Sequence, residues 1–280
     1  MGTVFEIIRA ALSGPRSRRP VRVDGEQIEL ETIDILNIDE PTLERVRLDL
    51  MRVMAAAYAT KAWPDGTIVG PEEYVDRALD RTTFDCFNGV VLAHDREGPV
   101  GFIASYVQRK QVLGREVEVI RIGAHVVPSA QSSGLTRISF IILALRYART
   151  RLWIGVPRYF LGLCLNPVSY RFIGRRTRRL YPSPTCPDDP MMVALCGASF
   201  PQERRVGDAI AEPRAPRIDA RLRASIDASD DPLIRYFVSR CPNYAEGYGL
   251  PIAAELGAAD FVYALAKHAW LGLTKRRRPS

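Results

Sequence analysis

Residues 115–148 read REVEVIRIGAHVVPSAQSSGLTRISFIILALRYA. The first part is rich in β-branched residues, which favours a strand, and Pro128 ends it. A short polar loop follows at 129–134, and the apolar residues after it have the spacing of a helix. The sequence therefore predicts a strand, a turn and a helix, with the polar loop at the point where the helix begins.

This loop is suited to binding an anion, because the first N–H groups of a helix lack intrahelical partners and the helix dipole is positive there. The loop and the first helical turn resemble the Q/R-x-x-G-x-G/A signature of the GNAT acyltransferases; these residues are Gln131, Ser132, Ser133, Gly134, Leu135 and Thr136. The third family position is Gly or Ala, and here it is Thr136. The resemblance implies that the loop holds the pyrophosphate of coenzyme A or phosphopantetheine, and Arg137 is expected to add a charge to these contacts.

The pattern along the rest of the chain fits the same family. We expect strands at 28–33, 90–93, 100–108, 117–127 and 159–165, and helices at 42–58, from Pro71, from the polar loop to about 150, and after Pro167. Three antiparallel strands followed by a helical crossover is the GNAT order, so the resemblance covers about residues 28–182. It implies an α/β fold with a mixed, mostly antiparallel sheet flanked by helices.

The ends of the chain are expected to lie outside this domain. We predict an N-terminal extension over 1–21, a GNAT-like domain over 22–200 and a largely helical C-terminal appendage over 201–280. Residues 183–220 are broken by prolines, and 252–273 have the spacing of an amphipathic helix.

Composition sets the broad class. The chain has 280 residues, 47% of them hydrophobic, and a net charge of +7, which is typical of a globular protein with a basic surface. No apolar run is long enough to span a bilayer and no secretory pattern is present, so a cytoplasmic protein is expected. Five cysteines without C-x-x-C spacing favour buried thiols over a disulfide framework or a metal site; these are Cys86, Cys164, Cys186, Cys196 and Cys241.

An acyltransferase of this class must hold a thioester, supply a neutral amine and protonate a thiolate. We expect strand amides near Val126 and Val127 to pair with the pantetheine arm as an added strand and to bind the thioester oxygen. GNAT chains often carry an Asn after the next strand and then a Tyr. Asn166 and Tyr170 resemble this pair, although Tyr170 lies four residues beyond the Asn where the common form has seven. The resemblance implies a donor-binding role for Asn166 and a catalytic role for Tyr170.

The candidates for the acceptor side lie on the long strand of the opening stretch. Strand alternation sends Glu118 to one face and Arg121 and His125 to the other. Glu118-Val119-Ile120-Arg121 resembles the E-x-x-R stretch of acyl-homoserine-lactone synthases and N-acyl amino acid synthases, which implies that Glu118 and Arg121 shape the acceptor site. Two alternatives stay open: a salt bridge for Glu118, and a structural role for His125.

Together these features predict N-acyl transfer from acyl-CoA or acyl-phosphopantetheine to a small primary amine, with an amino acid as one candidate and no tightly bound cofactor. Five arginines between Arg171 and Arg179 fit either an acidic acyl carrier protein or a solvated surface. The alternative function is a non-catalytic module that binds a carrier protein, an anionic membrane or nucleic acid. Sparse aromatic residues in the basic runs disfavour nucleic acid, whereas the C-terminal helix and its basic end fit a peripheral membrane contact.

Overall fold

The structure, a computed structural model, describes residues 14–23, 26–60, 70–84, 86–130, 135–151, 155–200, 204–212, 214–216, 218 and 220–257. The strands are β1 (Arg16–Val23), β2 (Glu26–Asp34), β3 (Tyr58–Thr60), β4 (Phe87–His94), β5 (Pro99–Val112), β6 (Arg115–Val126), β7 (Arg158–Cys164), β8 (Leu180–Tyr181), β9 (Arg205–Val206), β10 (Ala209–Ala211), β11 (Arg214–Pro216) and β12 (Tyr248–Glu255). The helices are α2 (Glu40–Ala57), α3 (Pro71–Ala78), α4 (Leu135–Arg151), α5 (Pro167–Gly174), α6 (Pro190–Ser199), α7 (Ala220–Asp227) and α8 (Pro232–Arg240).

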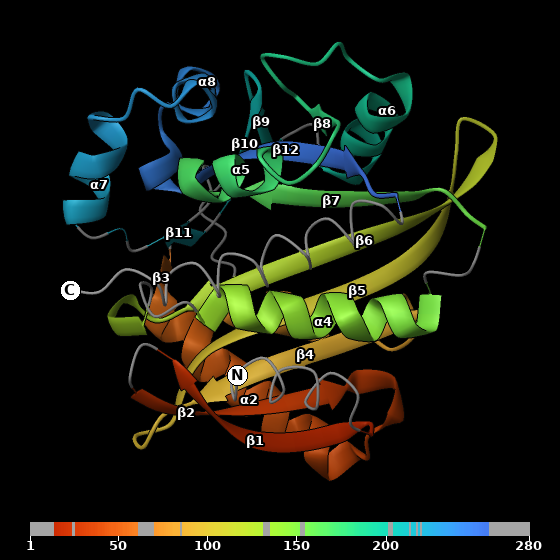
Figure 1. Cartoon of the computed structure of the whole chain (residues 1–280), viewed down its shortest axis with the longest axis vertical. Helices are drawn as coiled ribbons and strands as arrows, with labels where there is room; N and C mark the ends of the chain where they lie inside the picture. Colours follow the sequence, from red (N-terminus) through yellow and green to blue (C-terminus); the bar gives the residue numbers. More distant parts are fainter. Residues whose placement is uncertain are drawn as a thin grey trace, which may run out of the picture.

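A twisted sheet runs through the molecule (Figure 1). Within the described residues its strand order is β1-β2-β4-β5-β6-β7-β12-β10-β9, and the short β8 pairs with β12. Neighbouring strands are antiparallel except β6 and β7, which are parallel and are connected through α4. The predicted fold class, a mixed and mostly antiparallel sheet flanked by helices, is confirmed.

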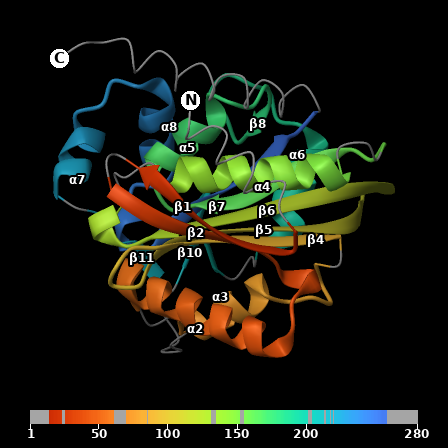
Figure 2. The same cartoon turned by 60° about the horizontal axis from the view of Figure 1, so that its bottom comes forward.

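The two faces of the sheet are covered by different helices (Figure 2). Helix α4 packs on one face, where Ile142 lies in a core cluster with Ile103 and Ile120. Helices α2 and α3 pack on the other face, where Leu50 lies in a cluster with Phe102. The central strands β4 and β5 therefore send alternate side chains to α4 and to the α2–α3 layer.

Several helices begin at an Asp or Asn followed by proline. Asp39 accepts a hydrogen bond from the Thr42 N–H at 2.9 Å and thereby caps α2. Asn166, Asp189 and Asp231 cap α5, α6 and α8 in the same way. Such a cap satisfies an N–H that the helix cannot pair, and proline in the first turn loses no helical hydrogen bond.

Two regions differ from the sequence-based expectations. Residues 16–21, expected to belong to an extension, are part of β1, which pairs with β2 from Arg16↔Ile33 onward. Residues 252–255, expected to begin a helix, complete β12, which lies between β7 and β10. A strand buried on both faces is apolar throughout, so its spacing cannot be distinguished from that of a buried helix. Residues 258–273 of the expected helix lie outside the described residues.

The predicted C-terminal appendage is only partly helical. Helices α7 and α8 lie in it, but β9, β10 and β12 belong to the main sheet. The domain limits at 22 and 200 stay predictions.

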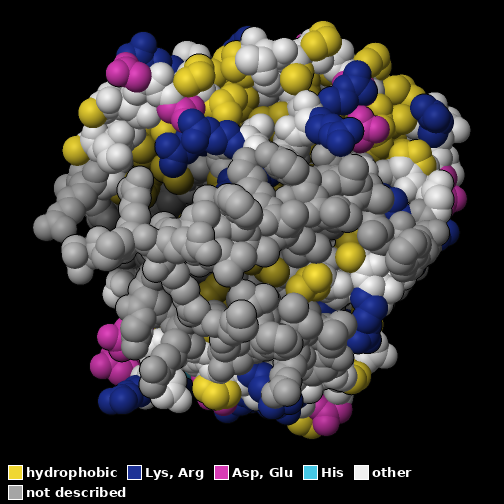
Figure 3. Space-filling model, in the orientation of Figure 1, with side chains coloured by type: hydrophobic (Ala, Val, Ile, Leu, Met, Phe, Trp, Pro, Cys, Tyr) yellow, Lys and Arg dark blue, Asp and Glu magenta, His cyan; other side chains and the backbone are white. Residues whose placement is uncertain are grey.

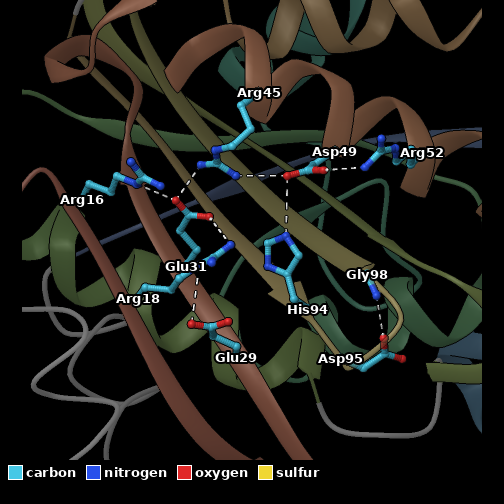
Figure 4. Close-up of polar contacts among 10 residues, drawn as sticks. All are labelled: Arg16, Arg18, Glu29, Glu31, Arg45, Asp49, Arg52, His94, Asp95 and Gly98. Carbon is cyan, nitrogen blue, oxygen red and sulfur yellow. Dashed lines mark hydrogen bonds and ion pairs between the residues drawn. The ribbon is translucent and has the colours of Figure 1, made fainter. Parts of the chain in front are cut away.

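An ion-pair network fixes the outer strands to α2 (Figure 4). Glu31 of β2 is fully buried, and its carboxylate accepts hydrogen bonds at 2.6 Å from Arg16 of β1 and from Arg45 of α2. Arg45 also donates to Asp49 at 3.0 Å, and His94 Nε2 of β4 lies 3.6 Å from Asp49 Oδ2. The network therefore links β1, β2, α2 and β4.

We expect Glu31→Gln to lower the free energy of unfolding by about 2–4 kcal/mol, because it leaves a buried cluster of arginines without its central charge. The figure is below that for a fully buried pair, since these arginines keep partial contact with water. Urea denaturation measures the change. In the matched control Glu29→Gln, an exposed carboxylate loses one contact of 3.6 Å to Arg18, and the expected change is below about 0.5 kcal/mol. Equal changes in the two variants would contradict this account of the network.

Candidate active site

The edge of β6 opens where β7 turns away from it (Figure 1). The parallel pairing of the two strands extends only from Glu118↔Arg158 to Ile120↔Phe160. Beyond Ile120, no strand in the described part of the chain pairs with this side of β6, although β6 continues to Val126.

Two backbone hydrogen bonds fix which β6 residues face the opening. The Val127 N–H donates to the Val100 carbonyl at 3.0 Å, toward β5, whereas the Glu118 N–H donates to the Pro157 carbonyl at 2.9 Å, on the β7 side. Because the backbone groups alternate along a strand, Ile122, Ala124 and Val126 direct theirs toward the opening. An extended ligand can add there as a strand.

The structure separates the two strand amides that the sequence indicated. Val126 faces the opening, in agreement with the predicted geometry. Val127 does not: its N–H is bonded to Val100, and its carbonyl accepts the Ala130 N–H at 2.9 Å. The donor-binding prediction for Val127 is therefore wrong in this geometry, because both of its backbone groups are already used.

On the α2–α3 face of β6, His125 joins two tyrosines. Its Nδ1 lies 2.8 Å from the Tyr58 hydroxyl and its Nε2 lies 2.7 Å from the Tyr74 hydroxyl. The ring also lies against Phe102, with centroids 4.7 Å apart, and the side chain is buried. In the neutral imidazole, one nitrogen donates a hydrogen bond and the other accepts one. The three residues therefore form a chain through which a proton can move.

Gly123 makes room for this chain. A Cβ built at Gly123 would lie 1.8 Å from the Tyr74 hydroxyl oxygen and 2.9 Å from His125 Nε2. Any side chain at 123 would therefore displace Tyr74 from the histidine. An isolated glycine in a strand often marks such a close approach.

Arg121 lies on the same face of β6, two residues before Gly123. It pairs across the ladder with Tyr106, and its guanidinium carbon lies 5.8 Å from the centre of the Phe200 ring beyond α6. Burial lowers the pKa of Arg121, and the neighbouring Arg77 lowers it further. The structure thus places Arg121 and His125 on one face, as predicted.

Glu118 lies on the opposite face and is fully enclosed. Its carboxylate accepts hydrogen bonds from the Tyr147 hydroxyl at 2.8 Å and from Arg151, and Arg158 Nε lies 3.7 Å away. Burial, together with the hydrogen bond to Glu118, raises the pKa of Tyr147. The structure therefore corrects the predicted acceptor-site role of Glu118: it pairs with arginines of α4 and β7 and does not meet Arg121.

Tyr170 and Asn166 also have structural partners. The Tyr170 hydroxyl donates to the Pro182 carbonyl at 2.7 Å, and the ring is fully buried in the core beneath α8. Burial raises the pKa of Tyr170 strongly. The Asn166 side chain accepts the Ser169 N–H at 2.8 Å as the cap of α5. These contacts give both side chains structural roles, and the expected catalytic role of Tyr170 and donor-binding role of Asn166 stay predictions.

The predicted phosphate loop is only partly described. A 3-10 turn at Pro128–Ala130 follows β6, and α4 begins at Leu135, as the sequence predicted. Leu135 is buried and Thr136 is exposed. Gln131, Ser132, Ser133, Gly134 and the side chain of Arg137 lie outside the described residues, so their contacts with a donor stay a prediction.

The arginines from Arg171 to Arg179 are largely paired. Arg175 lies 2.5 Å from Asp231, and Arg179 lies 3.3 Å from Asp189 and 3.4 Å from Glu255. On the face in Figure 3, basic side chains of the upper part stand beside acidic ones. This pairing favours a structural role for the cluster over a dedicated surface for an acidic carrier protein or another anionic partner.

Other predictions concern thiols, metals and membranes. Cys164, Cys196 and Cys241 are buried, and burial raises the pKa of each thiol to about 12, while Cys86 and Cys186 are partly exposed. Among the described residues no cluster of His, Cys, Asp or Glu has the arrangement of a metal site. A search of the same residues finds no helix long and apolar enough to cross a membrane.

Comparison with known proteins gives only weak likenesses. No protein-family model and no curated protein matches the sequence. Similar solved structures include a probable N-acyltransferase from Enterococcus faecalis (10% identity, TM-score 0.35) and a GCN5-related N-acetyltransferase from Kribbella flavida (20%, 0.34). Each match covers 52% of this chain, but only 32% and 33% of those two chains, respectively. A third similar structure is an acetyltransferase from Trypanosoma brucei, with 16% identity and a TM-score of 0.33. That match covers 57% of this chain and 99% of the acetyltransferase.

TM-scores and sequence identities this low do not indicate an activity for this chain. The fold class rests on the strand order and pairing described above, and the resemblance to acyl-homoserine-lactone synthases has no support from the separated Glu118 and Arg121.

Proposed function

We propose that this chain is an N-acyltransferase that moves an acyl group from a thioester to the primary amine of a small molecule. One observation carries the proposal: the open edge of β6 lies at the same strand positions as the Tyr58–His125–Tyr74 chain. A fold alone does not define an activity, so the proposal rests on this juxtaposition of a backbone edge with a proton-carrying chain.

The donor is proposed to bind along the open edge. The backbone groups of Ala124 and Val126 would pair with the amide groups of a pantetheine arm, as in strand addition. The helix N-terminus at Leu135, with the preceding polar loop, would bind the pyrophosphate. Coenzyme A and a carrier-bound phosphopantetheine share this arm, and the pairing of the arginines between Arg171 and Arg179 favours coenzyme A.

The chemical step needs no covalent enzyme intermediate. The amine nitrogen attacks the thioester carbonyl carbon, the N–C bond forms and the C–S bond breaks. The proton that the nitrogen loses balances the one that the departing thiolate gains. Tyr74 would accept the proton from the amine and pass its own to His125 Nε2, and backbone N–H groups of the β6 edge would stabilise the developing oxyanion.

The test is an incubation of the full chain with acetyl-, octanoyl- or palmitoyl-coenzyme A and a mixture of small amines. The proposal predicts N-acylated product, detected by mass spectrometry, in equal amount to the thiol released. Thiol without amide would indicate a hydrolase and contradict the proposal, as would the absence of both.

The donor edge can be tested separately. Ala124→Pro removes one N–H that faces the opening and leaves the pairing with β5 intact, because proline is tolerated at an unpaired strand edge. We expect affinity for coenzyme A, measured by calorimetry, to fall roughly 3- to 10-fold, the scale of one hydrogen bond. The control Ala124→Val keeps the N–H, and its affinity should be unchanged. Equal affinities in the proline and valine variants would place the donor elsewhere.

A further inference from the structure

Arg121 is half-buried, and its guanidinium makes no hydrogen bond or ion pair with any residue that the structure describes. Its Nε is fully buried without a partner. The groups around it are Tyr74, Tyr106, Phe200 and the cations Arg77 and Lys110. By contrast, Arg151 and Arg158 share the carboxylate of Glu118.

A charge withdrawn from water is costly when no opposite charge is paired with it, and no carboxylate among the described residues pairs with Arg121. Here the cost is increased by the neighbouring cations: burial and the nearby Arg121 lower the pKa of Lys110. An anion beside Arg121 would neutralise this group of charges. The side-on edge of a guanidinium, Nε with one Nη, matches a carboxylate in a bidentate pair.

The position of Arg121 relates this anion to the proposed reaction. Residues two apart on one face of a strand are separated by about 7 Å, so Gly123 and the Tyr74 hydroxyl above it share the face of Arg121, and Tyr74 lies near enough to act on the pKa of Arg121. In an α-amino acid the amine and the carboxylate are separated by a single carbon. With its carboxylate on Arg121, such a molecule would extend its amine toward Tyr74 and the open edge of β6.

We propose that Arg121 binds the carboxylate of the acyl acceptor, and that the acceptor is a free amino acid. This inference rests on the proposed function. A phosphate of the donor fits less well, because the helix N-terminus suited to phosphate belongs to α4, on the opposite face of the sheet from Arg121.

The experiment compares twenty free amino acids with their carboxamides, each set as a mixture, with the three coenzyme A donors above. The wild-type chain should acylate free amino acids with kcat/KM at least roughly 10- to 100-fold above the amides, the scale of a charge-assisted bidentate contact. Arg121→Gln should remove this preference by raising KM for the amino acids, so that their kcat/KM falls to the level of the amides. Arg121→Lys keeps the charge but not the bidentate geometry, so its preference for free amino acids over amides should be intermediate.

The control is Arg109→Gln, which removes an exposed arginine of β5 that pairs with Glu116 at 3.2 Å and should keep the preference. A binding measurement separates this inference from the proposed function. The amino acid mixture, without donor, should raise the melting temperature of the wild-type chain but not that of Arg121→Gln. Such binding without acyl transfer would overturn the proposed function and leave the Arg121 site standing. Two results would overturn the Arg121 proposal: equal acylation of free amino acids and their carboxamides by the wild-type chain, or unchanged melting temperatures of both chains in the presence of the amino acids.

Discussion

His125→Gln is expected to lower kcat for acyl transfer by roughly 10²- to 10⁴-fold, the usual cost of losing a general base. Glutamine can keep one hydrogen bond to Tyr58 or Tyr74, but it cannot accept a proton at neutral pH. The His125 ring packs beside Phe102, and a glutamine of similar size is expected to fill the same space, so the fold should persist. Steady-state kinetics with a saturating amine measures kcat, and circular dichroism checks the fold.

The matched control is His94→Gln, the same replacement at a histidine that contacts Asp49 in the network of Figure 4. Its kcat should be close to that of the wild-type chain. If His125→Gln retains kcat and loses stability instead, the histidine has the structural role that the sequence left open, and the base lies elsewhere.

Glu118→Gln is expected to lower the free energy of unfolding by about 3–5 kcal/mol, the usual cost of removing one partner from a buried ion pair. The variant leaves Arg151 and Arg158 close together without their shared carboxylate. Urea denaturation measures the loss, and turnover per folded molecule should change little because Glu118 faces α4.

Glu116→Gln is the matched control, since that carboxylate is exposed and pairs only with Arg109 at 3.2 Å among the contacts described; the expected change is below about 0.5 kcal/mol. A stable Glu118→Gln protein with turnover reduced roughly 10²-fold would instead restore the acceptor-site role that the E-x-x-R pattern implied.

The local elements could be predicted because they depend on spacing along the chain. The period of 3.6 residues identified α2, and the run of β-branched residues followed by Pro128 identified β6 and the start of α4. Alternation along β6 correctly separated Glu118 from Arg121 and His125. By contrast, β12 was mistaken for the start of a helix, because a run such as Leu250–Ala254 is apolar at every position.

The site could be predicted only in part, because its partners come from distant segments. His125 stood out as a histidine on the central strand, but Tyr58 and Tyr74 reach it from β3 and α3, and no spacing relates them to it. The one available signal was Gly123, an isolated glycine among β-branched residues that marks a close approach. The partners of Glu118 and Tyr170 were likewise invisible, since Arg151 and Pro182 become neighbours only when the sheet and its helices assemble.

The most direct test of the central claim is amide hydrogen exchange along β6, measured residue by residue by NMR with and without coenzyme A. The account predicts that the amides of Ile122, Ala124 and Val126 exchange about tenfold or more slowly once coenzyme A is bound, because the ligand pairs with them. The amide of Val127, already bonded to β5, should change little. Unchanged exchange at all three residues under saturating coenzyme A, or protection confined to other strands, would contradict the claim that the open edge of β6 is the donor site.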